Sequence, residues 1–287
     1  KLYYCNMNNF GDKLNEYIFP KLFNIDVEYA TTWDADYIGI GSILDNLLLQ
    51  TKDFINFYTT NFKNITKPIK VLSSGLGWET EHYESKLRFF YHPIFKRKIE
   101  LISVRGKKTL EQIKKIDKNI DTSNVALGDL GLLASFLIDN DIKNKKYDLG
   151  ICPHYAEKDN PIFQNILKNN PNSIIIDTQQ NPMEFLKQLS SCRAIISTGM
   201  HPLIAADSLN IPNIWCRISE KTTTIHKYQD YYSIFSIETP KPYYLKEDDK
   251  INKDFIVDSY KIQKDEIEDI KNNLYIHHKD YFSMKHQ

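Results

Sequence analysis

Residues 192–216, which read CRAIISTGMHPLIAADSLNIPNIWC, decide the fold. The run Ala194–Ser197 is apolar without alternation, as parallel strands covered on both faces are, and it therefore predicts a strand. A helix is predicted over Pro202–Leu209 and a second strand over Asn213–Cys216. A strand, a helix and a strand in this order form the unit from which parallel α/β sheets are built.

The same alternation extends along the rest of the chain in both directions. Short apolar runs that predict strands are separated by stretches with the apolar spacing of helices. We therefore predict an α/β protein with two Rossmann-like, doubly wound domains that face a cleft. The other expected strands are Leu2–Cys5, Val27–Ala30, Tyr37–Gly41, Ile69–Ser73, Glu100–Arg105, Val125–Gly128, Asp148–Pro153, Ser173–Asp177 and Tyr232–Ile237.

A polar stretch over residues 140–146 is the best linker in the chain. It predicts an N-terminal α/β domain over residues 1–140 and a second α/β domain over residues 146–245. A helical tail over residues 246–287 is expected to pack back on the body, and peripheral contact with a membrane surface is the alternative. In open α/β sheets ligands bind beyond the carboxyl ends of the strands, so the cleft between the domains is the expected site.

The composition excludes several classes of protein. The chain has 287 residues, of which 41% are hydrophobic and 26% charged, as in a globular protein and not in a disordered chain. Its 37 basic and 37 acidic residues give a net charge of zero, which argues against nucleic-acid binding. No apolar run is long enough to span a bilayer, and the first residues lack the layout of a secretion signal. We therefore expect a cytoplasmic protein with free thiols at Cys5, Cys152, Cys192 and Cys216.

The strongest indication of function is the turn between the predicted strand Ala194–Ser197 and the predicted helix Pro202–Leu209. It brings Ser197, Thr198 and His201 together at a helix N-terminus, beside Gly199. The positive end of the helix dipole favours a bound anion and lowers the pKa of a histidine placed there. A histidine with an adjustable pKa is a natural general acid or base. We therefore predict that His201 is catalytic.

Cationic side chains follow other predicted strands. Arg105 and Arg217 each end a strand, and arginine offers a planar fork that suits phosphate or carboxylate. His154 follows the first strand of the second half, and Lys227 belongs to the cluster His-Lys-Tyr-Gln-Asp. The functional interpretation is a cationic wall of the cleft. The structural alternatives, a lone histidine at a strand end and a surface loop with aromatic packing, stay open.

Asn8-Asn9-Phe10-Gly11-Asp12 follows the first strand. Gly11 can adopt dihedral angles that other residues avoid, and Asp12 can cap a helix that begins at Lys13. The N-terminus of that helix would offer N–H groups to an anion or a sugar hydroxyl. A plain loop with a helix cap is the equal alternative.

The chain lacks several motifs of metal-dependent and nucleotide-dependent chemistry. It has no His-Glu-x-x-His, no Gly-x-Ser-x-Gly and no Walker A loop. We therefore expect no metal and no cofactor, and a site built from Arg, Lys, His and helix N-termini. Such a site suits an anionic donor that carries phosphate and carboxylate groups.

Five segments resemble the polysaccharide pyruvyltransferases, in that family's order and over about residues 6 to 235. They read NNFGDKLN, SVRGKKT, LGDLGLL, GICPHY and STGMHPLIAADSLNIPNIW. The most similar branch installs ketal pyruvate during exopolysaccharide assembly, and its A-M-H-G-x-I-x-A-D-A-L-x-x-P and K-W-x-D segments read GMHPLIAADSLNIP and KYQD here. Other members carry Arg-Leu-His where this chain has Gly199-Met200-His201, and Tyr228 replaces the usual Trp.

The resemblance implies a fold like that of GT-B glycosyltransferases, with the acceptor on the first domain and the donor on the second. It implies phosphoenolpyruvate as the donor, and a sugar on a lipid-linked or nucleotide-linked carrier of a bacterial surface polysaccharide as the acceptor. Two sugar hydroxyls add to the enol carbon, phosphate leaves and a cyclic ketal forms, with His201 as the general acid towards the enol carbons. Donor contacts are expected from Arg105, Arg217, Lys227, Ser197, Thr198 and His154, and acceptor contacts from Asn9 and Asp12.

Two other functions stay open at this point. A GT-B glycosyltransferase that uses a sugar nucleotide would have similar cleft halves, and the identity of the bound donor would distinguish it. A non-catalytic glycan-binding protein with the same fold is the other alternative, because the family arginine is missing at Gly199.

Overall fold

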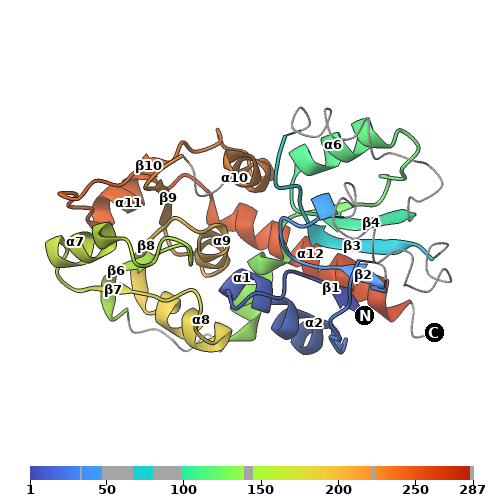
Figure 1. Ribbon diagram of the computed structural model, residues 1–287, viewed down its shortest axis with the longest axis horizontal. Helices are drawn as coiled ribbons and strands as arrows, with labels where there is room; N and C mark the ends of the chain where they lie inside the picture. Colours follow the sequence, from blue (N-terminus) through green and yellow to red (C-terminus); the bar gives the residue numbers. More distant parts are fainter. Residues whose placement is uncertain (33, 47–66, 80–97, 139–144, 221–223, 285–287) are drawn as a thin grey trace.

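The computed structural model describes residues 1–32, 34–46, 67–79, 98–138, 145–220 and 224–284. Within these residues the chain forms two parallel five-stranded sheets, which lie side by side (Figure 1). This arrangement confirms the predicted α/β fold with two Rossmann-like halves. Most of the predicted linker over residues 140–146 falls outside the described residues.

The first sheet follows the order of the sequence, β1-β2-β3-β4-β5. Its central strand shows why apolar runs without alternation form it. Val71 and Leu72 of β3 project to opposite faces, and both side chains are buried. The strands are β1 Leu2–Tyr3, β2 Tyr37–Ile38, β3 Ile69–Ser74, β4 Ile99–Val104 and β5 Ala126–Leu127. The expected strand Val27–Ala30 is reduced to a single bridge between Leu2 and Tyr29.

The second sheet has the order β7-β6-β8-β9-β10, so the chain starts in β6 and then reverses direction across the sheet. Strand order therefore switches between β6 and β8, and open parallel sheets bind ligands beyond the carboxyl ends at such a point. The strands are β6 Tyr147–Cys152, β7 Ser173–Ile175, β8 Cys192–Ser197, β9 Asn213–Arg217 and β10 Tyr243–Tyr244.

Helices cover the sheets and join the two halves. Phe10 of α1 stacks on Phe185 of α8 with ring centroids 4.1 Å apart, and its N–H donates to the carbonyl of Thr178 at 2.7 Å. The helices of the first half are α1 Phe10–Lys13, α2 Asn15–Phe23, α6 Lys107–Ile116 and the 3-10 helix η3 Leu130–Leu137. Those that follow are α7 Pro161–Asn169, α8 Pro182–Ser190, α9 Met200–Ser208, α10 Ile225–Tyr232, α11 Lys253–Ser259 and α12 Lys264–Ser283.

The expected strand Tyr232–Ile237 is wrong. The helix α10 ends at Tyr232 and a turn follows. The fifth strand of the sheet is β10, at Tyr243–Tyr244. The reason is the spacing of the buried aromatic side chains: Tyr228, Tyr231, Tyr232 and Phe235 recur at three- and four-residue intervals and form one helical face that continues into the turn.

The last helix returns to the first half. α12 contacts β5, η3 and α2, and it crosses from one sheet towards the other (Figure 1). His278 of α12 is buried, and its Nε2 lies 2.8 Å from the hydroxyl of Ser103 in β4. In the described part of the chain, no helix is long and apolar enough to cross a bilayer.

Candidate functional site

His201 lies beside the switch point of the second sheet. β8 ends at Ser197 and α9 begins at Met200, so His201 occupies the first turn of α9. The N-cap residue is Gly199, which has no side chain to accept from the first-turn N–H groups. These N–H groups and the helix dipole favour an anion at this end of α9.

The ring of His201 packs against the first half of the chain. A Cβ atom at Gly11 would lie 1.9 Å from Nδ1 of His201, so only glycine leaves room for the ring. Gly11 is therefore needed for this close approach, and not for the unusual dihedral angle that we expected, because its φ is not positive. The site is thus assembled from both halves.

Asp129 is the carboxylate nearest to His201. Its Oδ2 lies 3.9 Å from Nε2 of His201, and neither atom has a hydrogen-bond partner among the described residues. The other oxygen of Asp129 accepts from the N–H of Gly131 at 2.8 Å, as the N-cap of η3. Asp129 therefore caps η3 through one oxygen, which leaves its second oxygen 3.9 Å from the imidazole nitrogen.

Burial and neighbouring cations keep His201 neutral. Burial lowers the pKa of His201 to about 3, with smaller contributions from Lys227, Arg105 and His154. Burial raises the pKa of Asp129 to about 6, against the opposing effect of the Gly131 hydrogen bond. At neutral pH the imidazole is therefore uncharged and the carboxylate is mostly ionised.

Lys227 supplies a cation close to this pair. Burial, with a smaller contribution from Arg105, lowers its pKa to about 8, and the charges of Asp12 and Glu157 oppose this shift. Its ammonium lies 5.3 Å from the centroid of the Tyr228 ring. It has no hydrogen bond to any of the described residues, so its N–H groups are available to donate to a ligand.

Asp12 and Asn9 come from the loop and helix after β1. The N-cap of α1 is Asn9, and Asp12 lies in the first turn, which corrects the expected cap at Asp12. The side-chain amide of Asn9 donates to Asp12 Oδ2 at 3.1 Å. Burial raises the pKa of Asp12 to about 6, although Asn9, Lys227 and Lys13 act against this shift.

Arg105 is held entirely by the protein. Its Nε donates to Asp230 at 2.9 Å, and its other nitrogens donate to the hydroxyl of Ser42 at 2.5 Å and the carbonyl of Leu76 at 2.6 Å. Asp230 comes from α10 and also accepts from the backbone N–H and the hydroxyl of Thr109 at 2.8 and 2.7 Å. Arg105 therefore joins the two halves, and its role as a donor contact stays a prediction.

Ser197, Thr198 and His154 shape the switch point. The hydroxyl of Ser197 donates to the carbonyl of Cys152 at 2.7 Å and accepts from the N–H of Gly199 at 2.9 Å. The hydroxyl of Thr198 accepts from the N–H of His154 at 2.8 Å. Burial and Lys227 lower the pKa of His154 to about 4. These bonds fix the turn that presents His201.

Arg217 is the last residue of β9 and is buried. Its Nε donates to the carbonyl of Ser219 at 3.0 Å, and its charge contributes to the lowered pKa of Lys227. Arg217 therefore adds to the positive potential of the site. Among the described residues, no group of three or more His, Cys, Asp or Glu side chains is placed to hold a metal ion.

The family model for polysaccharide pyruvyl transferases matches residues 3–220. The chain belongs to the polysaccharide pyruvyl transferase family. The match includes His201, Asp129 and Arg217 and ends before Lys227, and it confirms the resemblance drawn from the motifs.

Two proteins to which the chain is similar are themselves uncharacterized. An uncharacterized protein of Acanthamoeba polyphaga mimivirus, L143, is 28% identical over 240 residues, which cover 82% of this chain and 74% of the relative. A functionally uncharacterized protein of Klebsiella pneumoniae has a solved structure that aligns with a TM-score of 0.47 and 15% identity, over 85% of this chain and 92% of that one.

Three acidic residues of the site were not among the predicted site residues. Asp129 lies beside His201, Asp230 holds Arg105, and the charge of buried Glu157 acts against the lowered pKa of Lys227. The segments LGDLGLL and KYQD drew attention to the first two, but only the fold brings them to their cationic partners. Nothing in the sequence around Glu157 marked it.

Proposed function

We propose that the protein transfers the enolpyruvyl group of phosphoenolpyruvate onto two hydroxyls of one sugar in a polysaccharide precursor, forming a cyclic ketal. The observation that carries this proposal is His201 at the N-terminus of α9, between the two halves and within electrostatic reach of Lys227. Membership of the family supports the reaction class. The cytoplasmic location, the bacterial surface glycan, its lipid-linked or nucleotide-linked carrier, and the independence from metals and cofactors stay predictions.

The donor would be bound by positive groups of the second half. Lys227 offers an ammonium without a hydrogen-bond partner in the described residues, and the first turn of α9 offers N–H groups. A phosphate and a carboxylate on one small molecule match these two elements. Arg217, His154 and the fixed Ser197-Thr198 turn would line the same end of the sheet.

The acceptor would be bound from the first half. Asp12 and Asn9 present a carboxylate and an amide next to Gly11, where the ring of His201 packs. These groups can accept from and donate to sugar hydroxyls. With a pKa of about 6, Asp12 is mostly ionised at neutral pH and can orient a hydroxyl for attack.

The reaction moves two protons and breaks one bond to phosphate. The two acceptor oxygens bond to C2 of the donor, C3 gains a proton to become a methyl group, and the bond from C2 to the phosphate oxygen breaks. The two acceptor hydroxyls lose two protons. One of them balances the proton that C3 gains, and the other leaves with the phosphate. His201 would hold the proton for C3, because the bound anionic donor and Asp129 both raise the pKa of a neighbouring imidazole.

Donor binding tests this proposal before any acceptor is known. A ligand that binds the native state raises the melting temperature by mass action. We expect phosphoenolpyruvate to raise it, and UDP-sugars and CMP-sugars to leave it unchanged. A shift with a sugar nucleotide alone would replace the proposal by a glycosyltransferase.

The charge of Lys227 should set the alkaline limit of donor capture. In the free protein its pKa is about 8, so the ammonium is lost as the pH rises through this value. We expect kcat/KM for phosphoenolpyruvate to fall above about pH 8, because this ratio reports the ionisation of the free enzyme. Rates measured between pH 6 and pH 10, roughly the range over which lysine and histidine titrate, give the profile.

Two variants make the assignment to Lys227 specific. Lys227→Arg keeps its charge at every pH of the profile, so the alkaline fall should move to higher pH. Lys227→Gln should weaken donor capture at all pH values. An unchanged fall near pH 8 in Lys227→Arg would show that another group titrates there.

Asp129 should act as a positioning residue for His201. Charges about 4 Å apart interact by roughly 4 kcal/mol at an effective dielectric constant of 20. Asp129→Asn keeps a side-chain oxygen for the Gly131 N–H but removes this charge. We expect kcat to fall on the order of 10²-fold with little change in KM for phosphoenolpyruvate, because the protonated imidazole is less stable.

The matched control for Asp129→Asn is Asp121→Asn, an exposed carboxylate in the same half that binds only its own turn. This control should leave kcat and KM unchanged. A rise in KM for Asp129→Asn with unchanged kcat would mean that Asp129 contacts the substrate instead.

A further inference from the structure

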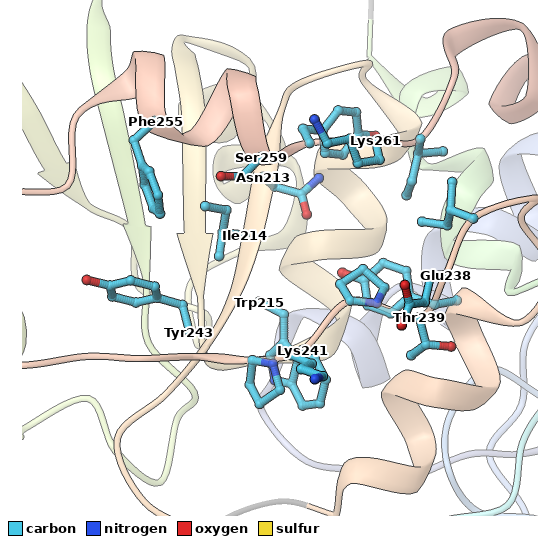
Figure 2. Close-up of a pocket in the computed structure, with 16 residues that line it drawn as sticks. Asn213, Ile214, Trp215, Glu238, Thr239, Lys241, Tyr243, Phe255, Ser259 and Lys261 are labelled. Carbon is cyan, nitrogen blue, oxygen red and sulfur yellow. The ribbon is translucent and has the colours of Figure 1, made fainter.

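A cavity of about 550 Å³ lies beside β9, and none of the predicted site residues lines it. Its walls are the first three residues of β9, the segment 237–243 and the turn that follows α11 (Figure 2). This volume falls within the usual range for pockets that bind small molecules, about 300–1,000 Å³. The lining combines a few polar groups with aromatic rings, among them Tyr243 and Phe255 at a centroid distance of 5.8 Å.

Two buried polar atoms on this wall have no hydrogen-bond partner among the described residues. They are the amide oxygen of Asn213 and the indole N–H of Trp215. The two residues stand two positions apart on β9 and therefore project to the same face. Figure 2 shows the amide oxygen of Asn213 directed towards the middle of the cavity.

The protein holds both side chains firmly. The nitrogen of Asn213 donates to Asp207 at 2.6 Å and to the carbonyl of Ile211 at 3.1 Å, so the amide cannot turn over to bring its nitrogen into the cavity. The indole of Trp215 stacks on Tyr228 with centroids 4.1 Å apart and planes 10° apart. Leaving a buried donor or acceptor without a partner costs about 1–3 kcal/mol, which a suitable ligand would recover.

The chemistry of the two atoms selects the ligand. An anion could accept from Trp215 but would be repelled by the Asn213 oxygen and by Asp207 behind it. An ammonium could donate to Asn213 but could not accept from Trp215. A neutral ligand with several hydroxyls can satisfy both atoms, since each hydroxyl carries one donor and two acceptor sites.

The cations of the cavity stand at its outer edge. Lys241 and Lys261 are exposed, and so is Glu238, which partly offsets their charge. The inner wall therefore favours a neutral ligand with several hydroxyls, and the aromatic rings favour one with apolar C–H faces. A sugar ring has both properties.

We propose that this cavity binds a neutral sugar residue, whose hydroxyls accept from Trp215 and donate to Asn213. The cavity would hold a glycan at a second position, separate from the site around His201. Binding there requires neither phosphoenolpyruvate nor turnover, so its test is independent of the proposed function.

The fluorescence of Trp215 can report binding in this cavity. The chain has three tryptophans, so the variant Trp33→Phe/Trp78→Phe leaves Trp215 as the only indole. We would titrate this variant with glucose, galactose, mannose, N-acetylglucosamine, lactose and cellobiose and follow its fluorescence. Affinities of the unmodified protein for the same sugars, from calorimetry, would show whether the substitutions disturb binding.

Three further variants locate the bound sugar. Trp215→Phe keeps the stack on Tyr228 but loses the N–H, and we expect about 10-fold weaker binding by calorimetry. Phe255→Ala removes an exposed aromatic wall and should also weaken binding. Val257→Ala, an exposed residue of the same helix that does not line the cavity, is the matched control and should bind normally.

The proposal expects saturable binding of at least one sugar that is sensitive to Trp215→Phe and Phe255→Ala and is not displaced by UDP or inorganic phosphate. It is overturned if no sugar binds, since the cavity then holds only water. It is also overturned if UDP or phosphate binds and this binding is weakened by Trp215→Phe and Phe255→Ala. The same holds if neither variant changes the affinity for the sugar.

Discussion

His201→Ala is expected to lower kcat for pyruvyl transfer by about 10²- to 10⁴-fold, the usual contribution of a positioned acid or base. The imidazole is the group that can carry a proton to C3 of the donor. It lies 3.9 Å from Asp129, packs against Gly11 of α1 and is within electrostatic reach of Lys227. Removing it leaves the donor contacts in place. Turnover with phosphoenolpyruvate, measured as phosphate release, gives the result.

The control for His201→Ala is His277→Gln. His277 lies on α12 and contacts the carbonyl of Ile102, outside the site. Both variants should melt near the temperature of the unmodified protein, and only His201→Ala should lose turnover while still binding phosphoenolpyruvate. Near-normal turnover in folded His201→Ala would remove this residue from the mechanism.

Arg105→Met is expected to lower the free energy of unfolding by about 3–5 kcal/mol, because it leaves a buried carboxylate without its cation. The side chains of Arg105 and Asp230 are both 0% exposed, and they join the segment that follows β4 to α10. Methionine fills similar space but satisfies neither Asp230 nor the carbonyl of Leu76. Chemical denaturation followed by circular dichroism measures the loss.

Arg193→Ala is the matched control, because the ion pair of Arg193 with Asp148 is half exposed. Exposed pairs contribute less than about 1 kcal/mol, so this variant should stay close to the unmodified protein. If Arg105→Met kept its stability and lost only donor affinity, Arg105 would be a donor contact, as the sequence predicted, and not the link between the halves.

The fold could be predicted from the sequence because local patterns carry it. The unalternating run Ala194–Ser197 and the helix that follows His201 form β8 and α9 almost as expected. The error at Tyr232–Ile237 arose where aromatic residues are compatible with both a strand and a helix. Their three- and four-residue spacing, and not their β-propensity, decided the outcome.

The site could be predicted only in part. His201 was found because a strand end, a glycine and a helix start are contiguous in sequence. Its partner Asp129 and the link from Arg105 to Asp230 join residues 72 and 125 positions apart, and no local pattern encodes such contacts. The requirement for glycine at position 11 also comes from tertiary packing, because the ring of His201 from the other half leaves no room for a side chain there.

Product analysis in D₂O tests the central claim most directly. The protein, phosphoenolpyruvate and a panel of hexosides with free neighbouring hydroxyl pairs would be incubated, and the products followed by mass spectrometry and NMR. We predict equal amounts of phosphate and of a sugar ketal whose new methyl group carries one deuterium, because C3 takes its proton from exchangeable groups. Transfer of a sugar from a sugar nucleotide, with no ketal and no phosphate from phosphoenolpyruvate, would contradict the account.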